Sequence, residues 1–149
     1  MAVESLLQQD GVEAMAARVM ALGPENQPQW GKMTCAQMLA HCQKPYQVAF
    51  GELELKRGWI GRLFGGMAKK KFVHTDAPFN RNSPTDPRFL QSGAADVAQE
   101  QEALVKLVRR FGAGETVITM HPFFGELSHH EWDRLMWKHL DHHLRQFGV

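Results

Sequence analysis

Apolar residues recur at intervals of three and four along four stretches of the chain, the spacing that places them on one face of an α-helix. The predicted helices cover residues 5–22, 34–54, 94–111 and 128–147. Two of them begin with a capping box, a Ser or Thr followed three positions later by Gln or Glu. The two pairs are Thr34 with Gln37 and Ser128 with Glu131. The first helix is expected to end before Gly23 and Pro24, because proline cannot continue a helix.

The connections between these helices differ greatly in length. Residues 55–93 carry several glycines and prolines, and they predict a long irregular crossover. Residues 116–127 are expected to form an ordered link, too isolated to build a sheet. Pro45 lies inside the second helix and is expected to kink it, because proline removes a backbone donor. The pattern predicts an all-α fold: a four-helix bundle with a long crossover between helices two and three, in a single domain over residues 1–149.

Composition and charge are those of an ordinary globular protein. Apolar residues make up 44% of the chain and the net charge is +1, so no overall field attracts nucleic acid or an anionic membrane. The first ten residues, MAVESLLQQD, have neither the basic region nor the apolar run typical of a signal peptide. No apolar run reaches the roughly 18 residues that a membrane span needs. We therefore expect a cytoplasmic protein with no nucleic-acid and no membrane partner. Cys35 and Cys42 are too far apart along one helix to bridge, and both are expected to be reduced and buried.

Histidine is the residue type that stands out, with eight in the chain, four of them between His130 and His143. At about 100° per residue, His139 and His143 share the apolar face of the last helix with Trp132. His142 lies at the edge of the polar side. The residues expected to face solvent from that side are Lys138, Asp141 and Arg145.

Two imidazoles four positions apart on one helical face can bind a single metal ion, and bundles build such sites from facing helices. His41 flanks the apolar stripe of the second helix and is the natural third ligand. Three protein nitrogens leave one position open, as in a catalytic site. Imidazoles suit Zn, Ni, Fe or Cu. The alternative is that these are partly buried histidines with ordinary hydrogen-bond partners.

Three segments carry a resemblance to a known superfamily. They are MTCAQMLAHC in the second helix, HPFFGELSHHEW before the last helix, and HLDHHLRQFG, with the pattern H-x-x-H-H-x-x-Q, within it. Over nearly its whole length the chain resembles an uncharacterised bacterial branch of the DinB-like (YfiT-like) metal-binding four-helix bundles. The resemblance implies a divalent metal, Zn or Ni, held by His41, His139 and His143, and a homodimer. Pro45, one turn after His41, departs from the better-studied members and puts the position of that ligand in doubt.

The resemblance also bears on activity. Characterised relatives include transferases and isomerases that use low-molecular-weight thiols such as bacillithiol, mycothiol or glutathione. It therefore implies a metal-dependent S-transferase in which a metal-bound thiol attacks a small-molecule electrophile. The alternative is a non-enzymatic stress-response bundle that binds a metal or another ligand. The sequence assigns no catalytic residue.

The remaining histidines and one glutamine are candidates for supporting roles. Gln146 or His142 is expected to hydrogen-bond a ligand imidazole, and His121 to line the mouth of a pocket. Three other histidines are expected to be structural or solvated, the last two of them exposed in the first turn of the last helix: His74, His129 and His130.

A basic stretch runs from Lys56 to Lys71, where six cationic side chains alternate with large apolar ones. Such a pattern is typical of a helix that rests on a membrane surface or contacts nucleic acid. Its four glycines weaken a long amphipathic helix, and the chain as a whole is nearly neutral. We therefore expect a short helix that covers one end of the bundle and leaves its lysines in water.

Overall fold

The structure is a computed structural model that describes residues 2–85, 87–89, 93–94 and 96–149. Within these residues the elements are α1 (Gln9–Met20), α2 (Cys35–Ala49), α3 (Trp59–Phe72), the 3-10 helix η1 (Pro87–Phe89), α4 (Val97–Gly112), β1 (Met120–His121), β2 (Gly125–Glu126) and α5 (His129–Gln146). The predicted all-α class is confirmed. None of the described helices has the length and apolar character needed to cross a membrane.

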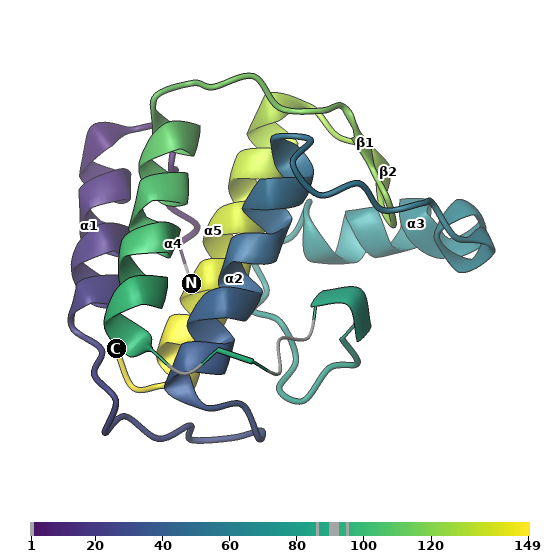
Figure 1. The fold of residues 1–149 in the computed structure, drawn as a ribbon. Coiled ribbons are helices and arrows are strands. Elements are labelled where there is room, and N and C mark those ends of the chain that lie inside the picture. The colour runs from purple at the N-terminus through teal and green to yellow at the C-terminus, as the bar shows by residue number, and fades with distance from the viewer. Residues whose placement is uncertain (1, 86, 90–92, 95) are drawn as a thin grey trace.

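Four helices, α1, α2, α4 and α5, form the bundle (Figure 1). α4 packs between α1 and α2, while α5 packs against α2 and α1 from the other side. The predicted long crossover joins α2 to α4. Because α2 and α5 are neighbours, side chains from residues near 41 and near 140 can meet in the interior.

Both predicted capping boxes are present, and they determine where α2 and α5 begin. The hydroxyl oxygens of Thr34 and Ser128 each accept a hydrogen bond at 3.2 Å from the backbone three residues on. The Gln37 and Glu131 side chains accept from the backbone of the capping residue in return. α2 ends earlier than predicted, at Ala49 rather than near residue 54. α2 continues through Pro45 without a break.

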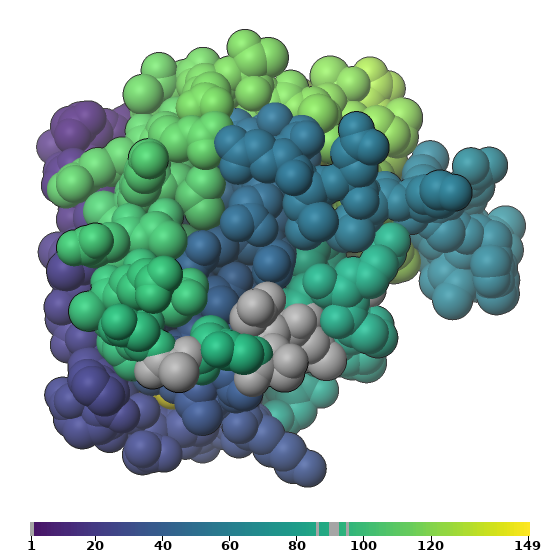
Figure 2. Space-filling view, in the orientation of Figure 1, coloured from purple at the N-terminus to yellow at the C-terminus, as the bar shows by residue number. Residues whose placement is uncertain are grey.

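The crossover is more ordered than predicted, and its helix α3 does not cover an end of the bundle. α3 packs mainly on β2 and projects away from the four bundle helices (Figures 1 and 2). Its buried residues are Gly61 and Gly65, and a Cβ atom at either position would clash with the carbonyl oxygen of Phe123. The glycines therefore allow α3 to lie directly on the backbone of the β1–β2 loop.

The segment before α5 forms a minimal hairpin, where only a link was expected. β1 and β2 pair antiparallel, with His121 opposite Gly125, and Gly125 has the positive φ of 82° that the turn requires. The His121 Nδ1 atom accepts hydrogen bonds from the backbone of Phe123 and Phe124, at 3.0 and 3.1 Å. Burial, with the nearby charge of Arg57, lowers the pKa of His121 to about 4.

The side of α5 predicted to face solvent is largely buried. The Lys138 Nζ atom donates hydrogen bonds of 2.7 Å to the carbonyl oxygens of Phe72, the last residue of α3, and of Thr75. Asp141 is also buried and forms an ion pair of 2.8 Å with Arg18 of α1. Arg145 is exposed, as predicted. The prediction was wrong for Lys138 and Asp141, because the crossover and α1 cover this side of the helix.

The titration of His121 makes the stability of the fold sensitive to acid. In the unfolded chain this imidazole takes up a proton below about pH 6.5, whereas in the folded chain it stays neutral down to about pH 4. Its contribution to the free energy of unfolding is therefore present above pH 6.5 and is lost as the pH falls to 4, a loss of about 3 kcal/mol.

We expect His121→Asn, which keeps an acceptor but does not titrate, to flatten the fall of the free energy of unfolding between pH 6.5 and 4. Urea denaturation at several pH values measures this slope for the variant and the wild type. His130→Asn, at an exposed histidine, is the control and should keep the wild-type slope. Identical slopes for His121→Asn and the wild type would contradict the assignment.

Candidate metal centre

Three imidazoles converge between α2 and α5. The His41 Nε2 atom lies 3.1 Å from the Nε2 atom of His139 and 3.1 Å from that of His143. All three potential ligand atoms lie within 4.8 Å of one another. Nitrogens bound to one ion at 2.0–2.1 Å are about 2.9–3.4 Å apart for bond angles between 90° and the tetrahedral value. The cluster can therefore hold a metal ion.

Local helical structure brings these side chains together. His139 and His143 are four positions apart on α5 and so lie one turn apart on the same face. The capping box at Thr34 sets the start of α2 and therefore the phase of His41. Pro45 does not displace His41, whose imidazole reaches both partners on α5.

Two of the imidazoles are oriented by groups that can only accept a hydrogen bond. The His143 Nδ1 atom lies 2.8 Å from the Oε1 atom of Gln146. The amide orientation of Gln146 is itself determined, because its Nε2 atom donates to the carbonyl oxygen of Trp30 at 2.7 Å. The His41 Nδ1 atom lies 3.0 Å from the carbonyl oxygen of Phe89. Both Nδ1 atoms must therefore carry the proton when the rings are neutral.

This choice of tautomer leaves a lone pair and no hydrogen on the Nε2 atoms of both His41 and His143, which lie 3.1 Å apart. The contact between His41 and His139 can be an N–H···N hydrogen bond, but the contact between His41 and His143 cannot. Protonation of one ring would turn this contact into a hydrogen bond, but burial disfavours the charged imidazole. It lowers the pKa of His41, lowers that of His143 to about 3, and holds that of His139 far below its usual range. A metal cation satisfies both lone pairs at once.

The three residues predicted to support the metal ligands lie in different surroundings. Gln146 hydrogen-bonds a cluster imidazole, as predicted, whereas His142 does not. The His142 ring lies between Trp30 and Phe79, at centroid distances of 5.6 and 5.9 Å. Phe79 also contacts the ring of His139, at 6.5 Å. His121 belongs to the hairpin, packed on Trp132 with its ring centroid 5.2 Å away, and does not belong to the cluster.

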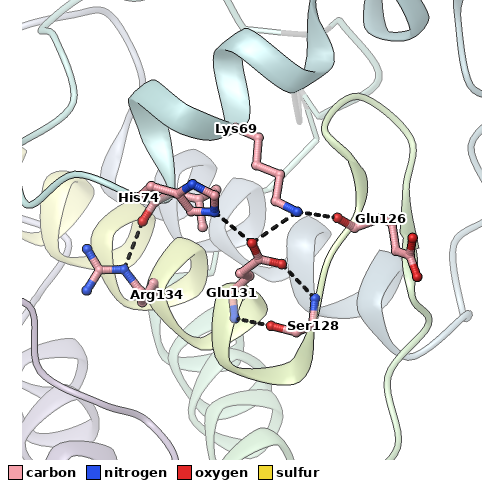
Figure 3. A network of polar contacts seen from close by, with 7 residues as sticks. Lys69, His74, Glu126, Ser128, Glu131 and Arg134 are labelled. Atoms are coloured by element: carbon pink, nitrogen blue, oxygen red, sulfur yellow. Dashed lines mark hydrogen bonds and ion pairs between the residues drawn. The ribbon is translucent and has the colours of Figure 1, made fainter.

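The other histidines lie outside the cluster, at the start of α5 and after α3. His74 lies 2.7 Å from a carboxylate oxygen of Glu131, which Lys69 also contacts (Figure 3). His130 is exposed, as predicted. His129 is half-buried, so its predicted exposure was wrong: its ring packs edge-on against Phe111 at 5.3 Å. Its Nε2 atom has no hydrogen-bond partner among the described residues.

The two cysteines are free and buried, as predicted. Burial raises the pKa of both thiols. Neither belongs to the group of possible metal ligands found in the described residues. A buried thiol with a raised pKa is a poor nucleophile, so Cys35 and Cys42 serve as small core side chains.

Two contributors to the site could not be identified from the sequence. They are the carbonyl oxygens of Phe89 and Trp30, which lie in connections between the bundle helices. Any residue type can supply a backbone carbonyl, so no sequence pattern marks these positions. Phe79, which packs beside His139, lies in the same long crossover as Phe89.

A comparison with known families identifies the group to which this chain belongs. The family model described as "Protein of unknown function (DUF1569)" matches residues 1–148. No curated protein and no solved structure matches the chain. Because the family model covers almost every residue, including the whole histidine cluster, the chain belongs to the DUF1569 family.

Proposed function

We propose that this protein is a divalent-metal-dependent enzyme of the DinB-like superfamily, with His41, His139 and His143 as its metal ligands. One observation carries the proposal: the Nε2 atoms of His41 and His143, neither of which carries a hydrogen in this tautomer, lie 3.1 Å apart in a buried site. A structural histidine pair would place a donor against an acceptor. Two oriented acceptors favour a cation instead.

The chain's own residues orient the ligands and limit access of water. Phe89 and Gln146 hold the rings of His41 and His143 through their Nδ1 atoms. Phe79 packs on His139, the one ligand of the three that is not fully buried. A divalent cation held by these three neutral imidazoles would keep its full charge and would supply a Lewis acid able to lower the pKa of a thiol. The half-buried His139 side is where a small substrate would approach.

The finer parts of the proposal come from the resemblance to the superfamily. We propose Zn or Ni as the metal, since imidazole ligands suit both, and a low-molecular-weight thiol as co-substrate. The reaction is an S-transfer to a small-molecule electrophile in the cytoplasm, by a homodimer. The alternative, a stress-response bundle that binds a metal without catalysis, is distinguished by the third experiment below.

Metal uptake tests the ligand set directly. Protein purified without a nickel column and then equilibrated with Zn or Ni is expected to retain one ion per chain by elemental analysis. His139→Ala/His143→Ala should retain almost none, and His41→Ala much less than the wild type, because each change removes a nitrogen ligand. The matched control, His130→Ala, changes an exposed histidine of the same helix and should bind as the wild type does. Equal metal content in the wild type and the double variant would refute the site.

Gln146 is expected to act on the metal through His143. Gln146→Leu removes the acceptor at the Nδ1 atom of His143, and metal affinity should fall by about 10- to 100-fold. Gln146→Glu keeps an acceptor oxygen for the Nδ1 atom of His143 but loses the donor to the carbonyl oxygen of Trp30, so it should restore only part of the affinity. Titration with a fluorescent zinc chelator as competitor measures both variants. A role of Gln146 in stability alone would predict a lower melting temperature with unchanged affinity.

Catalysis is tested with metal-loaded protein, a cellular thiol and a chromogenic electrophile. The expected result is thiol consumption that needs the metal and is lost in His139→Ala/His143→Ala, since that variant has no Lewis acid to lower the pKa of the thiol. His130→Ala should keep the activity. If the wild type binds metal but consumes none of the three thiols (glutathione, bacillithiol and mycothiol), the non-enzymatic alternative is supported.

A further inference from the structure

α3 turns its large apolar side chains away from the protein. Five of them form an apolar arc that is 47–69% exposed, namely Trp59, Ile60, Leu63, Phe64 and Met67. At about 100° per residue they lie within roughly 140° of the helix circumference. An exposed apolar patch of this kind marks an interaction surface, since scattered single residues would not share one face.

The opposite face of α3 is the one that packs on the protein. Gly61 and Gly65 lie on the backbone of Phe123, closer than any side chain would allow. The helix cannot roll to bury its apolar arc without losing this contact. In Figures 1 and 2 it projects from the bundle, so its outer face is free of the four bundle helices.

Polar contacts hold the carboxyl-terminal end of α3 in this pose (Figure 3). The Lys69 Nζ atom donates to the carbonyl oxygen of Glu126 at 2.7 Å and pairs with the Glu131 carboxylate at 3.0 Å. His74, just after the helix, contacts the same carboxylate at 2.7 Å. Because Glu131 also caps α5, the helix is attached to the start of a bundle helix.

The charge around the apolar arc is strongly positive. Residues 56–71 hold six cations and no acidic residue. The whole chain has a net charge of +1, so the remaining residues together carry −5. Within the described part of the chain, Lys69 is the one of these six that forms an ion pair. Lys70 and Lys71 are exposed at the end of the helix, on the same side as the apolar arc.

This charge distribution selects among possible partners. A second copy seated face to face on the arc would bring two clusters of six cations together, which is repulsive. Nucleic acid would satisfy the cations and could stack bases on the two aromatic rings of the arc, but it would leave Ile60, Leu63 and Met67 without apolar partners. An anionic lipid surface satisfies both, because acyl chains receive the apolar side chains while lysines reach the headgroups.

We propose that α3 is a membrane-surface anchor that inserts its apolar arc into the interface of an anionic bilayer. The expectation of no membrane partner rested on the near-neutral net charge of the whole chain and on a helix covering one end of the bundle. The charge is unevenly distributed, and α3 does not cover an end of the bundle. The helix lies in the plane of the interface and does not span it, and the bundle with its histidine cluster stays on the aqueous side. This inference is independent of the proposed metal chemistry.

Vesicle co-sedimentation tests the anchor, with vesicles of phosphatidylcholine mixed with phosphatidylglycerol beside pure phosphatidylcholine. The wild type is expected to bind the anionic vesicles, less strongly at high salt. Leu63→Glu/Met67→Glu places two charges in the apolar arc and should abolish binding. Lys70→Gln/Lys71→Gln should weaken it on the order of tenfold. Emission of Trp59 should shift to the blue on binding, a change that Trp59→Phe should lack.

Met20→Glu is the matched control, since Met20 is 53% exposed but lies on α1, and it should bind as the wild type does. All substituted positions are exposed, and circular dichroism checks that each variant folds. Absence of vesicle binding by the folded wild type overturns the proposal. So does a wild-type dimer that Leu63→Glu/Met67→Glu converts to a monomer, or binding of single-stranded RNA that the same variant retains.

Discussion

The burial of α5 on nearly all sides is the constraint that organises this protein. A helix that is covered on nearly all sides cannot leave polar side chains without partners, because each would lose its hydrogen bonds to water. The buried Asp133 carboxylate accepts hydrogen bonds of 2.6 Å from the Ser5 side chain and the Leu6 backbone. Lys138 binds the last residue of α3 and the segment after it, and Asp141 binds α1. Each of these three side chains thus holds a different part of the chain in place.

Sequence patterns were sufficient to predict where α2 and α5 begin and that the three imidazoles lie together. Capping boxes and the spacing of four positions depend only on residues close in sequence. Sequence patterns failed for Lys138 and Asp141, since helical phase gives the side opposite the apolar stripe but not what packs there. They failed again for α3, where glycines were taken only as helix-weakening residues. Gly61 and Gly65 instead permit a close approach to the hairpin, and that role depends on a partner elsewhere in the chain.

The crossover between α2 and α4 connects the two functional regions proposed for the molecule. It contains α3 near its start, and near its end it supplies the Phe89 carbonyl oxygen that orients His41. Phe79, between them, packs on His139. A segment predicted to be irregular therefore contributes to both the interior cluster and the outer surface. Long connections in compact domains commonly carry function in this way.

His41 and His139 are separated by 98 positions along the chain. An ion that joins them closes the intervening residues into a loop that includes α3, α4 and the hairpin but leaves α1 outside. Such a cross-link acts as a disulfide does, lowering the conformational entropy of the unfolded chain, and the effect grows with the logarithm of loop length. This protein has two free thiols and would thereby have a reversible cross-link between α2 and α5. Removal of the ion by a chelator would break that cross-link.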